Sequence, residues 1–302
     1  AFVVIDEQHR FGVRQRSILK SKGINPHLLT MTATPIPRTT ALALYGELDL
    51  SVISEMPKGR IPIKSFLVPK EKRKNAYEWI QKHVVEQKAQ VFVICPLIEE
   101  SEKETMQSVR AATKEFDTLS KSIFPKLKLG LLHGRMKSDE KERVMQGFKN
   151  KEFSILVSTS VVEVGIDIPD ATIIVIEGAE RFGLAQLHQL RGRVGRNNIQ
   201  SYCLLFTETI FPHVQKRLSY FAQHTSGFEI AEYDLAHRGE GEIHGTKQHG
   251  VTELKIASLA DFPLIEQTRS AVKTFIENYQ LSDYSLLKER VEKRGAHEIS
   301  RD

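Results

Sequence analysis

The segment FSILVSTSVVEVGIDIPDATIIVIEG, residues 153–178, contains the clearest signal for the fold class. It holds two short runs, residues 155–157 and 173–176, that consist only of isoleucine, leucine and valine. Strands of a parallel sheet are apolar on both sides in this way, because helices cover both faces of the sheet. We therefore predict two buried parallel strands here, separated by a polar connection.

The same pattern extends in both directions, over residues 58–206. Apolar runs of strand length recur at residues 63–68, 91–94, 127–132 and 203–206, and helical patterns lie between them at about 70–86, at 102–116 and from Ser138 onward. Ser138 is expected to cap its helix, with Asp139 and Glu140 in the first turn. Because strand and helix alternate along the chain, we predict an α/β fold with a doubly wound parallel sheet.

We divide the chain into three regions. Residues 1–57 hold strand-like runs at 2–5 and 28–32 and a helical stretch at about 38–45, which is half of an α/β domain. Residues 58–207 contain the complete doubly wound sheet. Residues 208–302 become charged and rich in glycine and histidine at 236–250, then return to helical patterns at 262–279 and 284–293. We expect this last region to be small and mainly helical, with a frayed tail.

Composition argues against several classes of function. No apolar run approaches the roughly 20 residues that span a bilayer, so we expect no membrane role. Cys95 and Cys203 lie in apolar runs, which predicts buried free thiols in a reducing, cytoplasmic setting. The histidines show no ligand spacing, so a structural metal site is not expected. Because Ala1 leads directly into an apolar run, we expect the chain to be a fragment of a longer protein.

The charge of the chain favours phosphate-bearing partners only weakly. The net charge is +5 and the isoelectric point is near 9.0, so an argument for nucleic acid must rest on local clusters. Residues 58–88 carry nine lysines and arginines against three glutamates. This segment is either a solvated helix face or a surface that tracks phosphates, and the sequence leaves both interpretations open.

Two acidic residues follow the first apolar run, in the motif DEQH at residues 6–9. Open α/β sheets bind their ligands at this edge, beyond the carboxyl ends of the strands. One of the carboxylates, Asp6 or Glu7, can hold Mg²⁺ through water while the other orients or deprotonates an attacking water. A helix-capping aspartate beside a solvated glutamate fits the same pattern, so the motif alone does not decide.

Hydroxyl side chains follow the second strand-like run, in TMTATP at residues 30–35. Thr32, Ala33 and Thr34 stand at the strand end, where small hydroxyl side chains can hydrogen-bond a neighbouring loop. Such a contact can relay a change at a bound nucleotide to the next domain. A polar turn before a helix, with Pro35 as the helix breaker, is the alternative.

A second hydroxyl cluster follows a buried strand, in STSVVEVGIDIP at residues 158–169. It continues into a turn that contains Gly165 and Asp167. Hydroxyls and backbone N–H groups bind the phosphates of nucleic acids, which positions a protein without reading the base sequence. We therefore predict that this segment contacts a nucleic-acid backbone.

Three arginines spaced by glycines occur in QLRGRVGR, residues 189–196. Arginine presents a planar and permanently charged fork, and glycine permits close approach of the backbone. These properties suit the charge that spreads over a γ-phosphoryl group during its transfer, which is the role of an arginine finger. A generic basic loop is the alternative.

Taken in order, these four motifs resemble the second, third, fifth and sixth motifs of superfamily-two helicases. The segments DEQHRFG, TATPIPRT, CPLIEESE, LHGRMK and IEGAERFGLAQLHQLRGRVGR together resemble the RecG family of branched-DNA helicases. The resemblance covers most of residues 1–206 and implies RecA-like domains, the first partial (1–57) and the second complete (58–207). It implies an ATP-dependent helicase that remodels stalled forks and Holliday-type junctions in DNA repair and recombination. We expect a monomer in the bacterial cytoplasm, associated with the nucleoid.

The resemblance also assigns roles to individual residues, with ATP and Mg²⁺ as the cofactors. Asp6 would hold Mg²⁺ and Glu7 would orient water, and the remaining roles fall into three groups. Catalysis would further involve His9, Gln189, Arg193 and Arg196; nucleotide coupling would involve Thr32, Ala33, Thr34, Gly165 and Asp167; DNA contact would involve His133, Arg135 and Thr159.

Beyond the helicase motifs, HRGEG at residues 237–241 and HGTKQ at 244–248 resemble the translocation motif of this family. The translocation residues would be Arg238, Gly245, Lys247 and Gln248. Two positions depart from the family pattern, since Glu240 stands where proline is usual and Lys247 where arginine is common. Lysine keeps the charge but loses the planar fork, so the hydrogen bonds at this position would differ.

The chain contains no phosphate-binding loop of the order Gly-x-x-x-x-Gly-Lys-Ser/Thr, and Gly245-Thr246-Lys247 has the wrong order. We therefore expect the isolated chain to be inactive in ATP hydrolysis. Two other interpretations stay open. One is the related transcription-repair coupling translocase, which would bind RNA polymerase; the other is a non-catalytic DNA-binding module.

Overall fold

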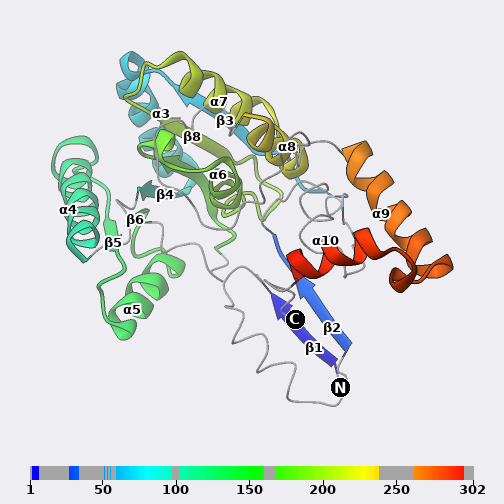
Figure 1. The fold of residues 1–302 in the computed structure, drawn as a ribbon. Helices are drawn as coiled ribbons and strands as arrows, with labels where there is room; N and C mark the ends of the chain where they lie inside the picture. Colours follow the sequence, from blue (N-terminus) through cyan, green and yellow to red (C-terminus); the bar gives the residue numbers. More distant parts are fainter. Residues whose placement is uncertain are drawn as a thin grey trace. The chain divides into compact units, whose positions relative to one another are not determined.

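The computed structural model describes residues 2–6, 27–33, 51, 53, 55, 59–96, 102–159, 168–237 and 262–295 (Figure 1). The chain divides into two compact units. Unit 1 consists of Ala1–Val52 with Ala231–Asp302, and unit 2 consists of Ile53–Ile230. The three regions that we assigned from the sequence differ in their boundaries from these units and stay a prediction.

Unit 2 is built on a six-stranded sheet in which every paired strand is parallel. The spatial order of its strands is β3-β8-β7-β4-β6-β5. Their bounds are Lys64–Val68 (β3), Gln90–Cys95 (β4), Leu129–Leu132 (β5), Ile155–Thr159 (β6), Ala171–Ile176 (β7) and Tyr202–Phe206 (β8). All residues of β4, β6 and β7 are buried, as their apolar runs predicted. The predicted α/β class and parallel sheet are confirmed.

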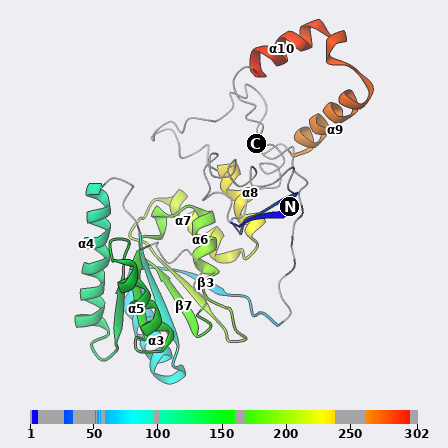
Figure 2. The same cartoon turned by 90° about the horizontal axis from the view of Figure 1, so that it is seen from below.

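Helices pack on both faces of this sheet (Figure 2). On one face, Tyr77 of α3 and Ala112 of α4 join Val93 of β4 in a single core cluster. Phe92, the preceding residue of β4, faces the opposite side, where its ring centroid lies 5.1 Å from that of Phe148 in α5. The helices are α3 (Arg73–Gln87), α4 (Glu102–Thr118), α5 (Ser138–Lys149), α6 (Leu184–Arg191) and α7 (Pro212–Gln223), with the short helical turns η2 (Lys70–Lys72), η3 (Leu119–Ile123) and η5 (Ala179–Arg181).

The prediction that Ser138 caps α5 was wrong. Ser138 is already the first helical residue, and Lys137 precedes it in an extended conformation. The carboxylate of Glu140 accepts a hydrogen bond from the backbone N–H of Lys137 at 3.2 Å. The helix start is therefore stabilised by a side chain within the first turn that reaches back, which is one half of a capping box.

Unit 1 contains two parallel strands and the C-terminal helices. Strands β1 (Phe2–Asp6) and β2 (His27–Met31) lie side by side in Figure 1. Helices α9 (Phe262–Asn278) and α10 (Ser285–Gly295) flank the turn η8 (Leu281–Asp283), and Phe275, Tyr279 and Tyr284 contact one another there. Helix α8 (Gly227–His237) crosses the boundary between the two units. The helix predicted at residues 38–45 lies outside the described residues.

None of the helices in the described part of the chain is long and apolar enough to cross a membrane. Cys95 and Cys203 are both buried in unit 2, in β4 and β8, as predicted. Burial raises the pKa of both thiols, to about 12 for Cys203, so neither is a thiolate at neutral pH.

Candidate functional site

The first group of predicted site residues lies at the carboxyl ends of β1 and β2. Asp6 ends β1 and pairs with Met31, which ends β2. The Asp6 side chain is exposed, and so are Thr32 and Ala33, which follow β2 directly. Parallel pairing thus brings the predicted metal-binding carboxylate and two predicted coupling residues to one edge of this sheet.

The second group is the arginine loop, residues 189–196, which includes the end of α6. Gln189 lies in the last turn of the helix, and Arg193 and Arg196 follow it. Arg193 is partly buried, whereas Arg196 is exposed, with its Nε 3.4 Å from the carbonyl oxygen of Gly192. The structure therefore places the three predicted catalytic side chains of this motif on one short segment.

Gly195 allows the arginine loop to pack closely against the segment that enters β3. Its φ angle of +71° lies in the left-handed region that favours glycine. A Cβ atom at this position would lie 2.8 Å from Cγ1 of Ile63, which is closer than real contacts allow. The carbonyl oxygen of Gly195 accepts a hydrogen bond from Nε of Arg60 at 3.0 Å. Only glycine fits here without displacing the loop.

Arg191 belongs to the same motif, but its contacts are those of a residue that stabilises the fold. It was not predicted as a site residue. Its side chain is buried, with 3% exposure. Nη1 donates to the carbonyl oxygens of Phe221 at 3.2 Å and His224 at 2.8 Å, and Nη2 donates to that of Thr225 at 3.1 Å. Carbonyls at the end of a helix lack intrahelical partners. Arg191 therefore fastens α6 to the end of α7.

His188 and Phe221 complete the surroundings of Arg191. The guanidinium carbon lies 4.4 Å from the ring centroid of Phe221, and Nη2 lies 3.0 Å from Nδ1 of His188. Because a guanidinium only donates hydrogen bonds, Nδ1 of His188 must accept. Burial and the charge of Arg191 lower the pKa of His188 to about 4, so the ring is neutral at pH 7, as an acceptor must be. His188 is therefore a packed residue of α6.

A buried ion pair that was not predicted lies at the carboxyl ends of β7 and β8. Glu177 follows β7 directly, is 8% exposed and pairs with Arg73, the first residue of α3. The hydroxyl of Tyr77 donates to Oε1 of Glu177 at 3.2 Å and accepts from Nε of Arg73 at 3.1 Å. The guanidinium carbon lies 4.8 Å from the ring centroid of Phe206. A carboxylate directly after an apolar run, the signal that marked Asp6, could have identified Glu177.

The pKa of Glu177 is raised to about 7, because burial disfavours its carboxylate more than Arg73 and Tyr77 favour it. In the unfolded chain the carboxyl has its ordinary pKa of 4.5, so the folded chain holds the proton more tightly. The stabilisation from this group is therefore complete below about pH 4.5 and is lost as the pH rises through about 7. We expect Glu177→Gln to remove this pH dependence.

Urea unfolding of the wild-type chain and of Glu177→Gln between about pH 5 and 8 measures this effect. The free energy of unfolding of the variant, relative to wild type, should increase as the pH rises. Glu208→Gln is the matched control, since Oε1 of Glu208 lies 3.9 Å from Nη1 of Arg73 but the Glu208 side chain is 73% exposed. Parallel pH profiles for wild type and Glu177→Gln would contradict the expected titration.

The third group follows β5 and β6 of unit 2. His133 is partly buried, and burial lowers its pKa; its Nδ1 has no hydrogen-bond partner among the described residues. Arg135 is exposed, and Nζ of Lys141 donates to the carbonyl oxygen of Gly134 between them at 2.8 Å. Thr159 is only 1% exposed, and its hydroxyl also lacks a partner in the described part. A DNA contact by Thr159 stays a prediction and requires that its hydroxyl become accessible.

The other predicted site residues lie outside the residues that the structure describes. They are Glu7, His9, Thr34, Gly165, Asp167, Arg238, Gly245, Lys247 and Gln248, and with them Glu240. Their roles stay predictions. Within the described ranges, no group of three or more His, Cys, Asp or Glu could hold a metal ion.

Two protein-family models match the chain. The model described as "Helicase conserved C-terminal domain" matches residues 74–198, which contain β4 to β7, α6 and the arginine loop. The model described as "ATP-dependent DNA helicase RecG, domain 3, C-terminal" matches residues 224–294. The two matches follow one another along the chain, from α3 into α10, and residues 199–223 between them belong to neither.

Individual relatives agree with these models. Over 93% of its length the chain is 49% identical to the ATP-dependent DNA helicase RecG of Thermotoga maritima, and over 97% it is 50% identical to that of Synechocystis sp.. A solved structure described as RecG bound to a three-way DNA junction matches 88% of the chain with 46% identity and a TM-score of 0.67. The chain spans 36% and 35% of the length of the two relatives and 33% of that structure.

Proposed function

Because the chain belongs to the RecG family, we propose that it supplies the second motor domain and the translocation region of an ATP-dependent DNA helicase. The whole protein hydrolyses ATP to move along double-stranded DNA, and it remodels stalled forks and Holliday-type junctions in repair and recombination. A three-way DNA junction bound to a similar protein supports branched DNA as the substrate class. The match of residues 224–294 to a RecG-specific model favours this function over a transcription-repair coupling translocase.

The observation that carries the proposal is the arginine loop. Its backbone is held by Gly195, packed against the segment that enters β3, and by Arg191, which fastens α6 to α7. This leaves Arg193 and Arg196 as the arginines of the motif that serve catalysis. Both guanidinium groups suit the charge that develops on a transferring phosphoryl group, because they are permanently charged donors on a fixed backbone.

The residues at the ends of β1 and β2 fit a magnesium nucleotide. Asp6 presents an exposed carboxylate, which is the ligand type that Mg²⁺ prefers, and Thr32 and Ala33 follow the neighbouring strand. Bound Mg-ATP supplies the γ-phosphoryl group whose transfer to water drives translocation. In our proposal Asp6 holds Mg²⁺ through water, Glu7 orients the attacking water, and Thr32 with Thr34 carries the nucleotide state to unit 2.

We further propose that the remaining predicted residues act on DNA. His133, Arg135 and Thr159 contact the DNA backbone, and Arg238 with Gln248 converts closure of the motor domains into a step. Backbone contacts of this kind position the protein without reading the sequence. The protein acts as a monomer in the bacterial cytoplasm, associated with the nucleoid, where its buried thiols Cys95 and Cys203 stay reduced.

The proposal is tested by ATP hydrolysis of this chain and of the full-length protein, each with three-way junction DNA, linear duplex or no DNA. We expect hydrolysis only by the full-length protein and stimulation that is greater with the junction than with the duplex. The isolated chain lacks a phosphate-binding loop, so it should not hydrolyse ATP under any condition. Full-length protein with no response to the junction would contradict a branched-DNA motor, and hydrolysis by the isolated chain would reveal a different nucleotide site.

A further inference from the structure

Arg60 connects the segment that enters β3 to the arginine loop, 135 residues further along the chain. Its Nε donates to the carbonyl oxygen of Gly195 at 3.0 Å, and the Arg60 side chain is partly buried. Hydrogen bonds from a charged donor are shorter and stronger than those between neutral groups. Gly195 lies two residues after Arg193 and directly before Arg196, so this bond acts on the backbone between the two predicted catalytic arginines.

Further contacts hold the same two segments together. Ile63 packs against Gly195 so closely that no Cβ atom fits between them. Nε2 of Gln200 donates to the carbonyl oxygen of Pro62 at 2.9 Å. The backbone N–H of Lys64 donates to the carbonyl oxygen of Ser201 at 3.0 Å, where β3 and β8 begin to pair. Residues 60–64 therefore lie along residues 195–201, and a shift of one segment must move the other.

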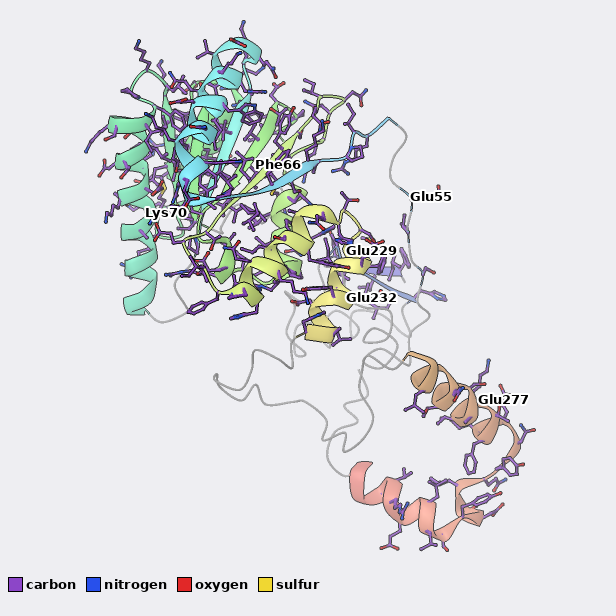
Figure 3. All side chains as sticks on the ribbon, turned by 90° about the horizontal axis from the view of Figure 1, so that it is seen from above. Glu55, Phe66, Lys70, Glu229, Glu232 and Glu277 are labelled. Atoms are coloured by element: carbon purple, nitrogen blue, oxygen red, sulfur yellow. The ribbon has the colours of Figure 1, made fainter. Side chains whose placement is uncertain are left out.

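Residues 60–64 follow closely on the passage of the chain from unit 1 to unit 2. Unit 1 ends at Val52 in this part of the chain, and unit 2 begins at Ile53. Figure 3 labels Glu55 in this part of unit 2, Phe66 in β3 and Lys70 at the start of η2. Arg60, like Ile63, therefore contacts the arginine loop from the part of the chain that follows the passage between the units.

We propose that Arg60 is a positioning residue for the arginine loop. By holding the Gly195 carbonyl, it fixes the direction of Arg193 and Arg196 and transmits movements of the connecting segment to them. The inference rests on the proposed function, because it presumes that these two arginines serve ATP hydrolysis. A small displacement of a catalytic group costs up to about 100-fold in rate. A loop that is held loosely therefore lowers kcat more than it weakens the binding of the substrate.

The test uses the full-length protein with three-way junction DNA and measures kcat and KM for ATP. We expect Arg60→Ala to lower kcat by about 10-fold or more while KM stays within about twofold, and Arg60→Lys to recover part of kcat because it keeps a charged donor. Arg143→Ala is the matched control, since Arg143 is exposed on α5 and its Nε donates to a carbonyl of its own helix, that of Asp139, at 3.4 Å. It should leave both constants unchanged.

Two further variants separate the inference from the proposed function. If Arg193→Ala keeps the wild-type kcat, the arginine-finger assignment fails, and the role of Arg60 fails with it. If Arg193→Ala loses activity but Arg60→Ala keeps wild-type kcat, or changes KM alone, only the inference about Arg60 is overturned. In the double variant, Arg60→Ala should lower kcat by a smaller factor than it does in the wild-type protein, because the part of its effect that acts through Arg193 is already lost; the same factor in both backgrounds would also overturn it.

Discussion

Replacing Arg193 with alanine in the full-length protein is expected to lower kcat for ATP hydrolysis by about a thousandfold or more. The charge on a transferring phosphoryl group is neutralised by preorganised donors, and alanine removes both the charge and the fork. Single-turnover hydrolysis of ATP on junction DNA measures the effect. Arg193 belongs to the arginine loop and is not one of the predicted DNA contacts, such as His133 and Arg135. The affinity for junction DNA without nucleotide should therefore stay at the wild-type level.

Arg193→Lys is the informative companion variant. Lysine keeps a positive charge at this position but loses the planar fork, so its kcat should lie between wild type and Arg193→Ala. Equal kcat for the two variants would mean that the fork, and not the charge alone, is required. Wild-type hydrolysis by Arg193→Ala would reject Arg193 as an arginine finger, and equal loss of hydrolysis and of DNA affinity would instead indicate a disrupted domain.

Replacing Arg191 with alanine is expected to destabilise the chain by about 3 kcal/mol, because three carbonyls at the end of α7 and just beyond it lose a buried charged donor. For a domain of this size, such a loss lowers Tm by about 6–12 °C. The Arg191 guanidinium also lies over the ring of Phe221, so packing is lost together with the hydrogen bonds. Thermal unfolding of this chain, followed by circular dichroism, measures the change.

Arg196→Ala is the matched control for this prediction. Arg196 belongs to the same motif and carries the same charge, but its side chain is exposed, so the variant should unfold within about 2 °C of wild type. The Tm of Arg191→Lys should lie between those of Arg191→Ala and Arg196→Ala, since an ammonium group keeps the charge but cannot reach all three carbonyls at once. Equal Tm values for Arg191→Ala and Arg196→Ala would contradict a structural role for Arg191.

The sheet of unit 2 could be predicted because its signal is local. Every strand of the two sheets overlaps an apolar run identified in the sequence, and the clearest runs became the fully buried β4, β6 and β7. Buried parallel strands need apolar residues at every position, whatever lies elsewhere in the chain. The start of α5 was harder to predict, because Ser138 and Glu140 both suit a helix start, and only the backbone conformation of Lys137 decides between them.

Residue roles depend on neighbours that are distant in the sequence. Glu177 looks like a solvated carboxylate after a strand until the fold brings Arg73 to it from 104 residues away. In the same way, the bond between Arg60 and Gly195 has no signature in either segment. The sheet order places β3 beside β8, and this adjacency alone creates the contact.

The sequence by itself determined the α/β class, the parallel strands and the family to which the motifs belong. These follow from apolar runs and from residue types at fixed spacing, which are short-range properties of the chain. The tertiary structure alone decided that Arg191 of the motif QLRGRVGR has a structural role. Arg191, Arg193 and Arg196 have the same side chain, but Arg191 is buried and donates to carbonyls at the end of α7 and just beyond it, whereas Arg196 is exposed. A guanidinium that is buried needs such acceptors, so its surroundings, and not its position in the motif, set its role.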